Sequence, residues 1–455
     1  MGMRSLLVLC LLGLPLAGVA KVSEFTLENG LKIIVKEDHR APVLVSQVWY
    51  KVGASYEPNG LTGISHVLEH MMFKGTQKHG PNEFSRIIAA HGGKENAFTG
   101  SDYTGYYQKL HKDRLEISFE MEADRMRHLA LNAAEFSKEI KVVMEERRSR
   151  TDDNPQALTF EHFKAASYMS SPYQNPVIGW MADLENLAVA DLQKWYEKWY
   201  APNNATLVVA GDVDAKAVFQ LAQKYFAGLK PSELNLPRMT TEVPQRGVRR
   251  IVVKAPAQLP YLIMGYHVPS LKTAPEPWEA YALEVMAHIL DGGQSARFAK
   301  HLIRETQVAA EISTSYDLFA RLSEQFIFAG TPSQNYRVED LEKAIKGQIK
   351  RLQDDIISAP ELNKVQTQVV AQKTYEKDSV HYQAMQIGAL ETVGLKWQKM
   401  DELVEKVRAV TPAQIQAVAK KYFNEDNLTV AVLEPQPLAR ATAAATQPGA
   451  TKNAH

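Results

Sequence analysis

A repeated segment constrains the fold of this chain more than any other feature of its sequence. Residues 195–210 and residues 418–432 have the same layout, in which an amphipathic helix ends in an asparagine-rich turn and an alternating apolar strand follows. The two copies lie about 220 residues apart, which is too far for stacked solenoid repeats and fits a duplicated domain. A chain of 455 residues is also longer than one hydrophobic core usually serves. We therefore predict two homologous domains.

Strand-like apolar segments and long helical segments occur together in both parts of the chain. In the first part the strand-like segments are 31–36, 43–52 and 207–210. This mixture predicts an α+β fold, in which each domain is a mostly antiparallel sheet with helices packed on one side. Prolines and a glycine between residues 230 and 249 interrupt any periodic structure and mark the boundary. We assign residues 21–235 to an N-terminal domain and residues 236–436 to a C-terminal domain.

The N-terminal twenty residues, 1–20, have the layout of a secretory signal peptide. Arg4 precedes an apolar run, and small residues, Gly18 and Ala20, stand where a signal peptidase cleaves. The run is too short to span a bilayer, so no stable membrane anchor is expected. We predict an exported protein, with a bacterial periplasm as its location.

Composition argues against several classes of function. It also indicates that one end of the chain is not part of the folded domains. Cys10, the single cysteine, lies inside the predicted signal peptide, so the mature chain has no disulfide and no thiol for catalysis. Basic and acidic residues number 52 each, so the charge balance does not point to nucleic acid or to an anionic membrane. Residues 437–455 are rich in Ala, Thr, Pro and Gly without an apolar pattern, which predicts a disordered tail.

Residues 66–70 carry the pattern H-x-x-E-H, the reverse of the H-E-x-x-H pattern of many zinc enzymes. On an α-helix, His66 and His70 are one turn apart on the same face, so both can bind one metal ion. Glu69 projects from the same side. The other residues are largely apolar, which predicts a buried helix, where these polar groups are costly unless a divalent metal satisfies them. The alternative is a pair of ordinary core histidines with hydrogen-bond partners.

A third ligand is needed, because a catalytic zinc takes three protein ligands and keeps one position open. Residues 136–148 predict a helix, in which Glu139 and Glu146 lie together at the edge of an apolar stripe and Glu145 points away. Glu146 is therefore the candidate ligand, and Glu139 is placed to orient a ligating group. One alternative is a solvated run of charges, and another is a closed structural zinc site. Three histidines could be the fourth ligand of a closed site: His79, His91 and His128.

These residues resemble the signature of the pitrilysin-type (M16) zinc metallopeptidases, a family that includes insulin-degrading enzyme and the mitochondrial processing peptidase. The family pairs H-x-x-E-H with a downstream glutamate inside an E-x6-E element. Here 75 residues lie between His70 and Glu146, and Glu139 begins the E-x6-E element. Other segments that resemble family landmarks are 92–106, 172–179 and 203–212. The resemblance extends from about Phe25 to Pro435 and implies a short, two-domain form of the family.

The resemblance implies a zinc site and a mechanism of peptide-bond hydrolysis. One Zn²⁺ per chain would be bound by His66, His70 and Glu146, and Glu139 would orient a ligand. Glu69 would act as the general base toward the attacking water and then carry the proton to the leaving amine. No covalent intermediate is required.

The resemblance also implies how substrate binds. An extended peptide would add as a strand to a sheet edge, and the residues that line this edge would be Asn96, Ala97 and Phe98. Without the resemblance, this stretch would be an ordinary strand after a Gly-Gly turn. Backbone pairing selects extended, unstructured peptides over folded proteins.

The predicted C-terminal domain departs from the family at a second substrate-binding element. Its segment 278–290 corresponds by position to the zinc helix, but it carries only His288, which we interpret as a core residue. Family members bind substrate with an arginine and a tyrosine seven residues apart. Here Arg304 fits the arginine, but Glu311 stands at the tyrosine position. A carboxylate there can pair with Arg304 and mask it, and Tyr316 is not an obvious replacement.

The departure at Glu311 affects which protein subunits we expect this chain to assemble with. Family members enclose substrate between four such domains, on one long chain or on two shorter chains. A two-domain chain with zinc ligands and no Arg/Tyr pair resembles the catalytic half of a heterodimer, whose homologous partner would carry that pair. A homodimer is the alternative. A non-catalytic, scaffold-like subunit is the rival from another class, although a scaffold has no use for the costly H-x-x-E-H set.

Overall fold

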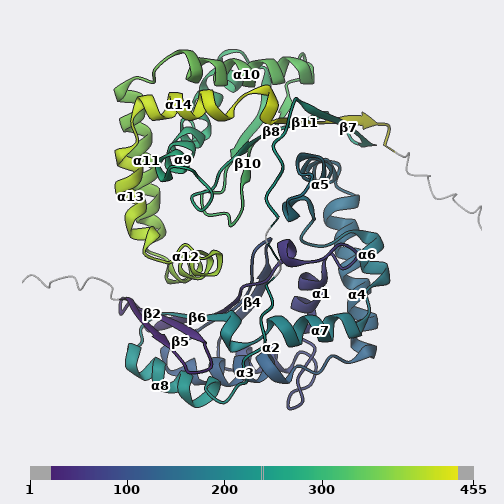
Figure 1. Cartoon of the computed structure of the whole chain (residues 1–455), viewed down its shortest axis with the longest axis vertical. Coiled ribbons are helices and arrows are strands. Elements are labelled where there is room, and N and C mark those ends of the chain that lie inside the picture. The colour runs from purple at the N-terminus through teal and green to yellow at the C-terminus, as the bar shows by residue number, and fades with distance from the viewer. Residues whose placement is uncertain (1–21, 237, 239, 439–455) are drawn as a thin grey trace, which may run out of the picture.

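The computed structural model describes residues 22–236, 238 and 240–438. The predicted signal peptide and residues 439–455 of the predicted tail lie outside the described residues. Figure 1 shows two halves stacked on one another, each built around one β-sheet. We call residues 22–229 the first half and residues 249–436 the second half, and no described residue between them is in a helix or a strand. In the described part of the chain, no helix has the length and apolar character needed to cross a membrane.

The two sheets contain six and five strands. Those of the first sheet are β1 (Val22–Thr26), β2 (Lys32–Glu37), β3 (Val43–Tyr50), β4 (Lys94–Thr99), β5 (Thr104–His111) and β6 (Ala205–Gly211). Those of the second sheet are β7 (Arg249–Pro256), β8 (Tyr261–Val268), β9 (Ala309–Ser315), β10 (Glu324–Pro332) and β11 (Leu428–Gln436).

Helices make up most of the remaining described chain. The first half contains α1 (Ile64–Met71), α2 (Glu83–Ala90), α3 (Leu115–His128), α4 (Ala133–Arg147), α5 (Pro155–Ser167), α6 (Met181–Asn186), α7 (Val189–Trp199) and α8 (Ala215–Phe226). The second half contains α9 (Pro277–Asp291), α10 (Val338–Asp354), α11 (Ala359–Glu376), α12 (Val380–Val393), α13 (Lys399–Ala409) and α14 (Pro412–Tyr422). Three short helical turns also matter below: η1 (Ala54–Tyr56), η3 (Arg148–Asp152) and η6 (Phe298–Glu305).

The two sheets share one topology. The strand orders are β1-β2-β6-β3-β5-β4 and β7-β11-β8-β10-β9. Once β1 is set aside, both begin with a parallel pair, β2 with β6 and β7 with β11, and every other neighbouring pair is antiparallel. The repeated sequences occupy equivalent places, because α7 leads into β6 as α14 leads into β11. The predicted α+β fold with two related, mostly antiparallel sheets is confirmed.

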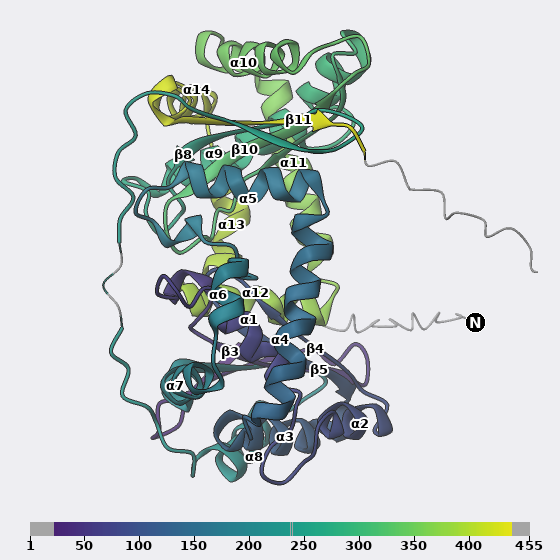
Figure 2. The same cartoon turned by 90° about the vertical axis from the view of Figure 1, so that its right-hand side faces the viewer.

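Each sheet is covered on both faces, so the expectation of helices on one side only is wrong. In the first sheet, α12 of the second half packs on β3 and β6, and its residues Ala384 and Ile387 join Trp49 in one apolar cluster. In the second sheet, α5 of the first half packs on β7, β8 and β11, where Phe163 and Ile263 belong to one apolar cluster. Figures 1 and 2 show these two exchanged helices between the halves. The central strands β3 and β6 are buried on both faces, and such strands need cover on both.

A buried ion pair joins the halves. Arg321 of the second half donates from Nε to Asp102 Oδ1 at 2.8 Å and from Nη2 to Ser55 Oγ at 2.7 Å. Its guanidinium lies 4.2 Å from the centroid of the Tyr56 ring, and Tyr173 donates to the other oxygen of Asp102. Ser55 and Tyr56 belong to η1, which directly precedes the helix that carries the H-x-x-E-H pattern. The second half therefore contacts η1, the helical turn that precedes α1 in the chain.

Candidate metal centre

Two carboxylates outside α1 fix its N-terminus. Glu57 accepts hydrogen bonds from the backbone N–H groups of Gly63 and Ser65 at 2.7 and 2.8 Å, and Asp183 accepts one from the N–H of Thr62 at 3.1 Å. A helix N-terminus has unpaired N–H donors and a partial positive charge, so acidic partners stabilise it. Glu57 is buried, and this burial raises the pKa of its carboxyl group to about 7 even though the two N–H groups lower it.

The periodicity of α1 separates an apolar side from a polar one. Ile64, Leu68 and Met71 are fully buried in the core of the first half. His66 and His70 are one turn apart on the other side, with their ring centroids 4.8 Å apart. Their side chains are only 12% and 21% exposed. The sequence pattern thus places both imidazoles at the edge of the core, as the helical spacing predicts.

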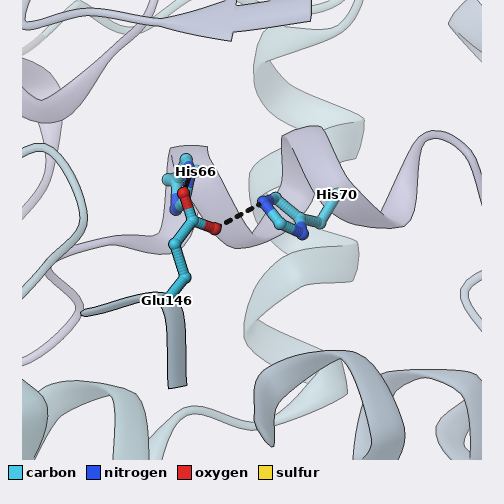
Figure 3. Close-up of side chains that lie close together, drawn as sticks. All are labelled: His66, His70 and Glu146. Atoms are coloured by element: carbon cyan, nitrogen blue, oxygen red, sulfur yellow. Dashed lines mark ion pairs between the residues drawn. The ribbon is translucent and has the colours of Figure 1, made fainter. Parts of the chain in front are cut away.

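Helix α4 brings a glutamate to these histidines. Glu146 lies in its last turn, with Oε2 at 3.3 Å from His70 Nε2 and Oε1 at 3.9 Å from His66 Nε2. Figure 3 shows the carboxylate between the two imidazole rings. The ligand-type atoms of the three residues lie within 4.8 Å of one another. By contrast, Glu145 points away, its side chain is 72% exposed, and it pairs with Arg148.

The chemistry of this donor set fits a catalytic zinc ion, because two imidazoles and one carboxylate are a ligand set of known zinc hydrolases. Burial, with the charges of His70 and Arg150, lowers the pKa of His66 to about 3, so its imidazole is neutral at pH 7. Burial alone would lower the pKa of His70, but the hydrogen bond to Glu139 and the charges of Glu146, Glu139 and Glu69 raise it. In the described part of the chain no other group of His, Cys, Asp and Glu side chains is close enough to hold a metal.

Glu139 contacts the far side of one of these imidazoles. Its Oε1 lies 2.9 Å from His70 Nδ1, and its Oε2 accepts from Lys74 Nζ at 2.6 Å. A carboxylate on Nδ1 fixes the ring orientation and leaves Nε2 for a metal. Burial would raise the pKa of Glu139, but His70 and Lys74 lower it, which keeps this carboxylate ionised. His66 has no such partner among the described residues, where its buried Nδ1 makes no hydrogen bond.

Glu69 lies on the same helix, largely buried. Its Oε2 accepts a hydrogen bond from the hydroxyl of Thr99 at the end of β4. Burial raises the pKa of the Glu69 carboxyl group, while the hydrogen bond from Thr99 and the charge of His70 act in the opposite direction. A carboxylate with a raised pKa accepts a proton more readily near neutral pH.

The strand β4 forms one edge of the first sheet, next to α1. Asn96 is exposed, and Ala97 and Phe98 are half-buried. Ala97 packs against the core that contains α1, whereas Phe98 packs against the cluster beneath α12. All three predicted substrate-binding residues therefore lie on an edge strand beside the candidate metal centre.

The structure does not bring together the predicted pair in the second half. Arg304, in η6, donates from Nη1 to the carbonyl oxygen of Gln294 at 2.6 Å, and among the described residues it forms no ion pair with Glu311. The ion pair that a carboxylate at position 311 could form with Arg304 is therefore absent from the described part of the chain, where both side chains are exposed. Tyr316 donates to the carbonyl oxygen of Pro269 at 2.7 Å, so it is already engaged.

The histidines considered for a closed site lie elsewhere. His79, His91 and His128 do not belong to the one metal-ligand group of the described residues. His128 instead pairs with Asp124 at 3.1 Å, and His288 of α9 lies 3.6 Å from Glu284.

Sequence reasoning missed several residues around the centre. Arg150, in η3, lies 2.5 Å from Glu146 Oε1 through Nη1, and Glu57, Lys74 and Thr99 act as described above. Lys74 follows His70 by four residues, so helical spacing could have suggested that it lies nearby. The same spacing relates Arg150 to Glu146, and Glu57 lies only six and eight residues before its partners Gly63 and Ser65. Thr99 could not have been identified from the local pattern, because it is 30 positions away from Glu69.

Comparison with known proteins gives consistent matches over both halves. Residues 32–180 match the family model described as Insulinase (Peptidase family M16), and residues 186–369 match the model described as Peptidase M16 inactive domain. The zinc protease PqqE of Helicobacter pylori is 34% identical over 76% of this chain and 78% of its own length. An uncharacterised zinc protease of Bacillus subtilis, YmxG, is 24% identical over 91% of this chain and 98% of its own.

Solved structures agree. The crystal structure of a protease from Helicobacter pylori superposes with a TM-score of 0.87 at 30% identity, over 92% of this chain and 100% of that one. The periplasmic protease PqqL of Escherichia coli has the same fold, with a TM-score of 0.76 at 16% identity, and this chain spans 52% of its length. Sequence and structure together show that this chain, in a two-domain form, belongs to peptidase family M16.

Proposed function

We propose that this protein is a zinc-dependent endopeptidase that hydrolyses extended, unstructured peptides. The observation that supports this most directly is the convergence of His66, His70 and Glu146, from two helices, with Glu69 on the same helix as the histidines. We assign the first three as zinc ligands, one Zn²⁺ per chain. In this proposal residues 21–235 form the catalytic domain, and residues 236–436 form the homologous domain that lacks metal ligands.

The roles of the protein groups follow from their contacts. The chemistry that bound zinc supplies is Lewis acidity, which polarises a peptide carbonyl and acidifies a water molecule. Glu69 accepts the proton of the attacking water and delivers it to the leaving amine. Glu139 holds the ring of His70, whose Nδ1 lies 2.9 Å from its carboxylate. Partial burial of the site keeps bulk water from competing with these contacts.

Substrate binding is assigned to the edge of β4. An extended peptide would pair with the backbone there, beside Asn96, Ala97 and Phe98, and this pairing needs no particular side-chain sequence. The signal-like N-terminus supports a location outside the cytoplasm, which we assign to a bacterial periplasm. Nucleic acid has no role in this proposal.

We further propose that the chain is the catalytic subunit of a heterodimer, because Glu311 stands at the position of the family's tyrosine. The partner would be a homologous subunit that carries an Arg/Tyr pair. A homodimer is the second possibility. The alternative function, a scaffold-like subunit without catalysis, is disfavoured by the converged ligand set.

The test is hydrolysis of an unstructured fluorogenic peptide by the purified, zinc-loaded mature chain. Glu69→Gln should bind one zinc and lose turnover, and Glu146→Gln should lose zinc. Glu145→Gln is the matched control, since this neighbour on α4 is exposed and pairs only with Arg148. Turnover retained in Glu69→Gln would refute its role as the base. Bound zinc without turnover in the wild type would refute independent activity and point to an obligate partner.

A further inference from the structure

Thr99 is a polar residue at the candidate site to which the proposed function gives no role. It is the last residue of β4, and its hydroxyl donates a hydrogen bond to Glu69 Oε2. Among the described residues, this is the single hydrogen bond that the Glu69 side chain makes. The orientation of the proposed base therefore depends on one donor from another element.

The position of Thr99 follows from the alternation of β4. Side chains of a strand point alternately to its two faces, so Ala97 and Thr99 share one face and Phe98 takes the other. Ala97 packs against the core that includes α1, and Phe98 packs on the side of α12. Thr99 therefore faces α1, where Glu69 lies.

The same strand is the one assigned to substrate binding. Thr99 comes directly after Phe98, so the hydroxyl that donates to Glu69 belongs to the same edge strand along which a peptide would lie. A hydroxyl on this strand fixes the carboxylate relative to the peptide backbone and not only relative to its own helix. Such fixing matters because misplacement of a catalytic group by about 1 Å can lower a rate about 100-fold.

We propose that Thr99 is a positioning residue whose hydroxyl orients the Glu69 carboxylate toward the peptide bound along β4. Thr99 does not touch the reacting atoms and acts through Glu69. This inference rests on the proposed function, since it assumes that Glu69 is the base.

The experiment compares two substitutions in the full mature chain loaded with zinc. Thr99→Val keeps the shape and removes the hydroxyl, whereas Thr99→Ser keeps the hydroxyl. A hydrogen bond to a charged group corresponds to a loss of about 10- to 100-fold in kcat when it is removed. We expect this loss in Thr99→Val, with KM within about twofold of the wild type, and we expect Thr99→Ser to retain most of kcat.

Thr104→Val is the matched control. Thr104 lies directly opposite Thr99 on β5, is buried, and donates to the carbonyl oxygen of Val52 at 2.9 Å. Removal of its hydroxyl costs a buried hydrogen bond without any contact to Glu69, so it should lower stability and leave kcat unchanged. Zinc affinity, measured by competition with a chromophoric chelator, should be the same in the wild type and in all three variants.

The outcomes separate this inference from the proposed function. Wild-type kcat in Thr99→Val, with Glu69→Gln inactive, would overturn the role of Thr99 and leave the peptidase intact. A raised KM with normal kcat would also overturn it, because Thr99 would then act on substrate binding alone. Equal, background rates in the zinc-loaded wild type and Glu69→Gln would refute independent activity of the chain and the positioning role with it.

Discussion

The buried pair of Arg321 and Asp102 should be one of the strongest single connections between the two halves. Both side chains are 6% exposed, and the substitution Arg321→Met keeps most of the apolar stem while it removes the charge. Asp102 would then retain hydrogen bonds from Ser55 and Tyr173 but lose its cationic partner inside the protein.

The structure sets the magnitude. At 2.8 Å, two unit charges attract with roughly 6 kcal/mol for an effective dielectric constant of about 20. Burial also removes both charged groups from water, which costs free energy, so the net stabilisation by the pair is smaller than this attraction. Removal of one partner leaves the other charge uncompensated, and for buried pairs this costs about 3–5 kcal/mol. We expect Arg321→Met to lower the free energy of unfolding by that amount.

Urea unfolding, followed by tryptophan fluorescence, measures this loss. Asp102→Asn and the double variant complete a mutant cycle, and the double variant should be less destabilised than the sum of the single variants by about 2 kcal/mol or more. Asp378→Asn is the matched control. Asp378 also links the halves, through Arg40 at 3.1 Å, but these two side chains are 75% and 56% exposed, so the loss should be within about 1 kcal/mol. If Arg321→Met costs no more than Asp378→Asn, the buried pair does not stabilise the junction.

Three further predictions follow from individual contacts. Glu139→Gln should weaken zinc binding about 10- to 100-fold in a chelator competition, because His70 loses its orienting carboxylate, whereas Glu135→Gln, whose residue pairs with Lys138 on the same helix, should leave the affinity unchanged. Gly388→Ala should destabilise the protein to urea by about 1–3 kcal/mol, since the added Cβ would lie 2.1 Å from the Trp49 ring; Gly347→Ala in α10 has open space and should be neutral or slightly stabilising. The folded-state pKa of Glu57, about 7, lies above its ordinary value of 4.5, so its contribution to stability is present at low pH and lost as the pH rises from about 4.5 through about 7. Glu57→Gln should therefore reduce the difference between the free energies of unfolding measured at about pH 5 and about pH 8. An unchanged difference would contradict the raised pKa of Glu57.

The sequence predicted the candidate ligands because their arrangement is local. His66, Glu69 and His70 fall within two turns of one helix, so the helical period alone places them together. The helical period also predicted that Glu139 and Glu146 lie on one side of α4 and that Glu145 faces solvent. In the structure Glu139 and Glu146 both approach His70, and Glu145 is exposed. The sequence also predicted the duplication, because both copies of the helix–turn–strand segment keep the same pattern.

Tertiary structure decided how distant segments meet. The covering of each sheet by a helix of the other half, and the contact of Arg321 with Asp102, join segments that are far apart in the sequence; Arg321 and Asp102 are 219 positions apart. An apolar face shows that it must be covered, but its pattern does not specify the segment that covers it. The pairing of Glu311 with Arg304 that the sequence allowed does not form for the same reason, since spacing along the chain did not determine their contact.

What the sequence determined by itself is therefore the type of site and the candidate ligands, because the helical period places His66 and His70 on one face of their helix and favours Glu146 over Glu145 on another. What only the folded chain decided is how those residues are held. Thr99 reaches Glu69 from a strand 30 positions away, and Glu139 reaches His70 from a helix 69 positions away. Such contacts depend on how sheets and helices pack, and packing is a property of the whole fold.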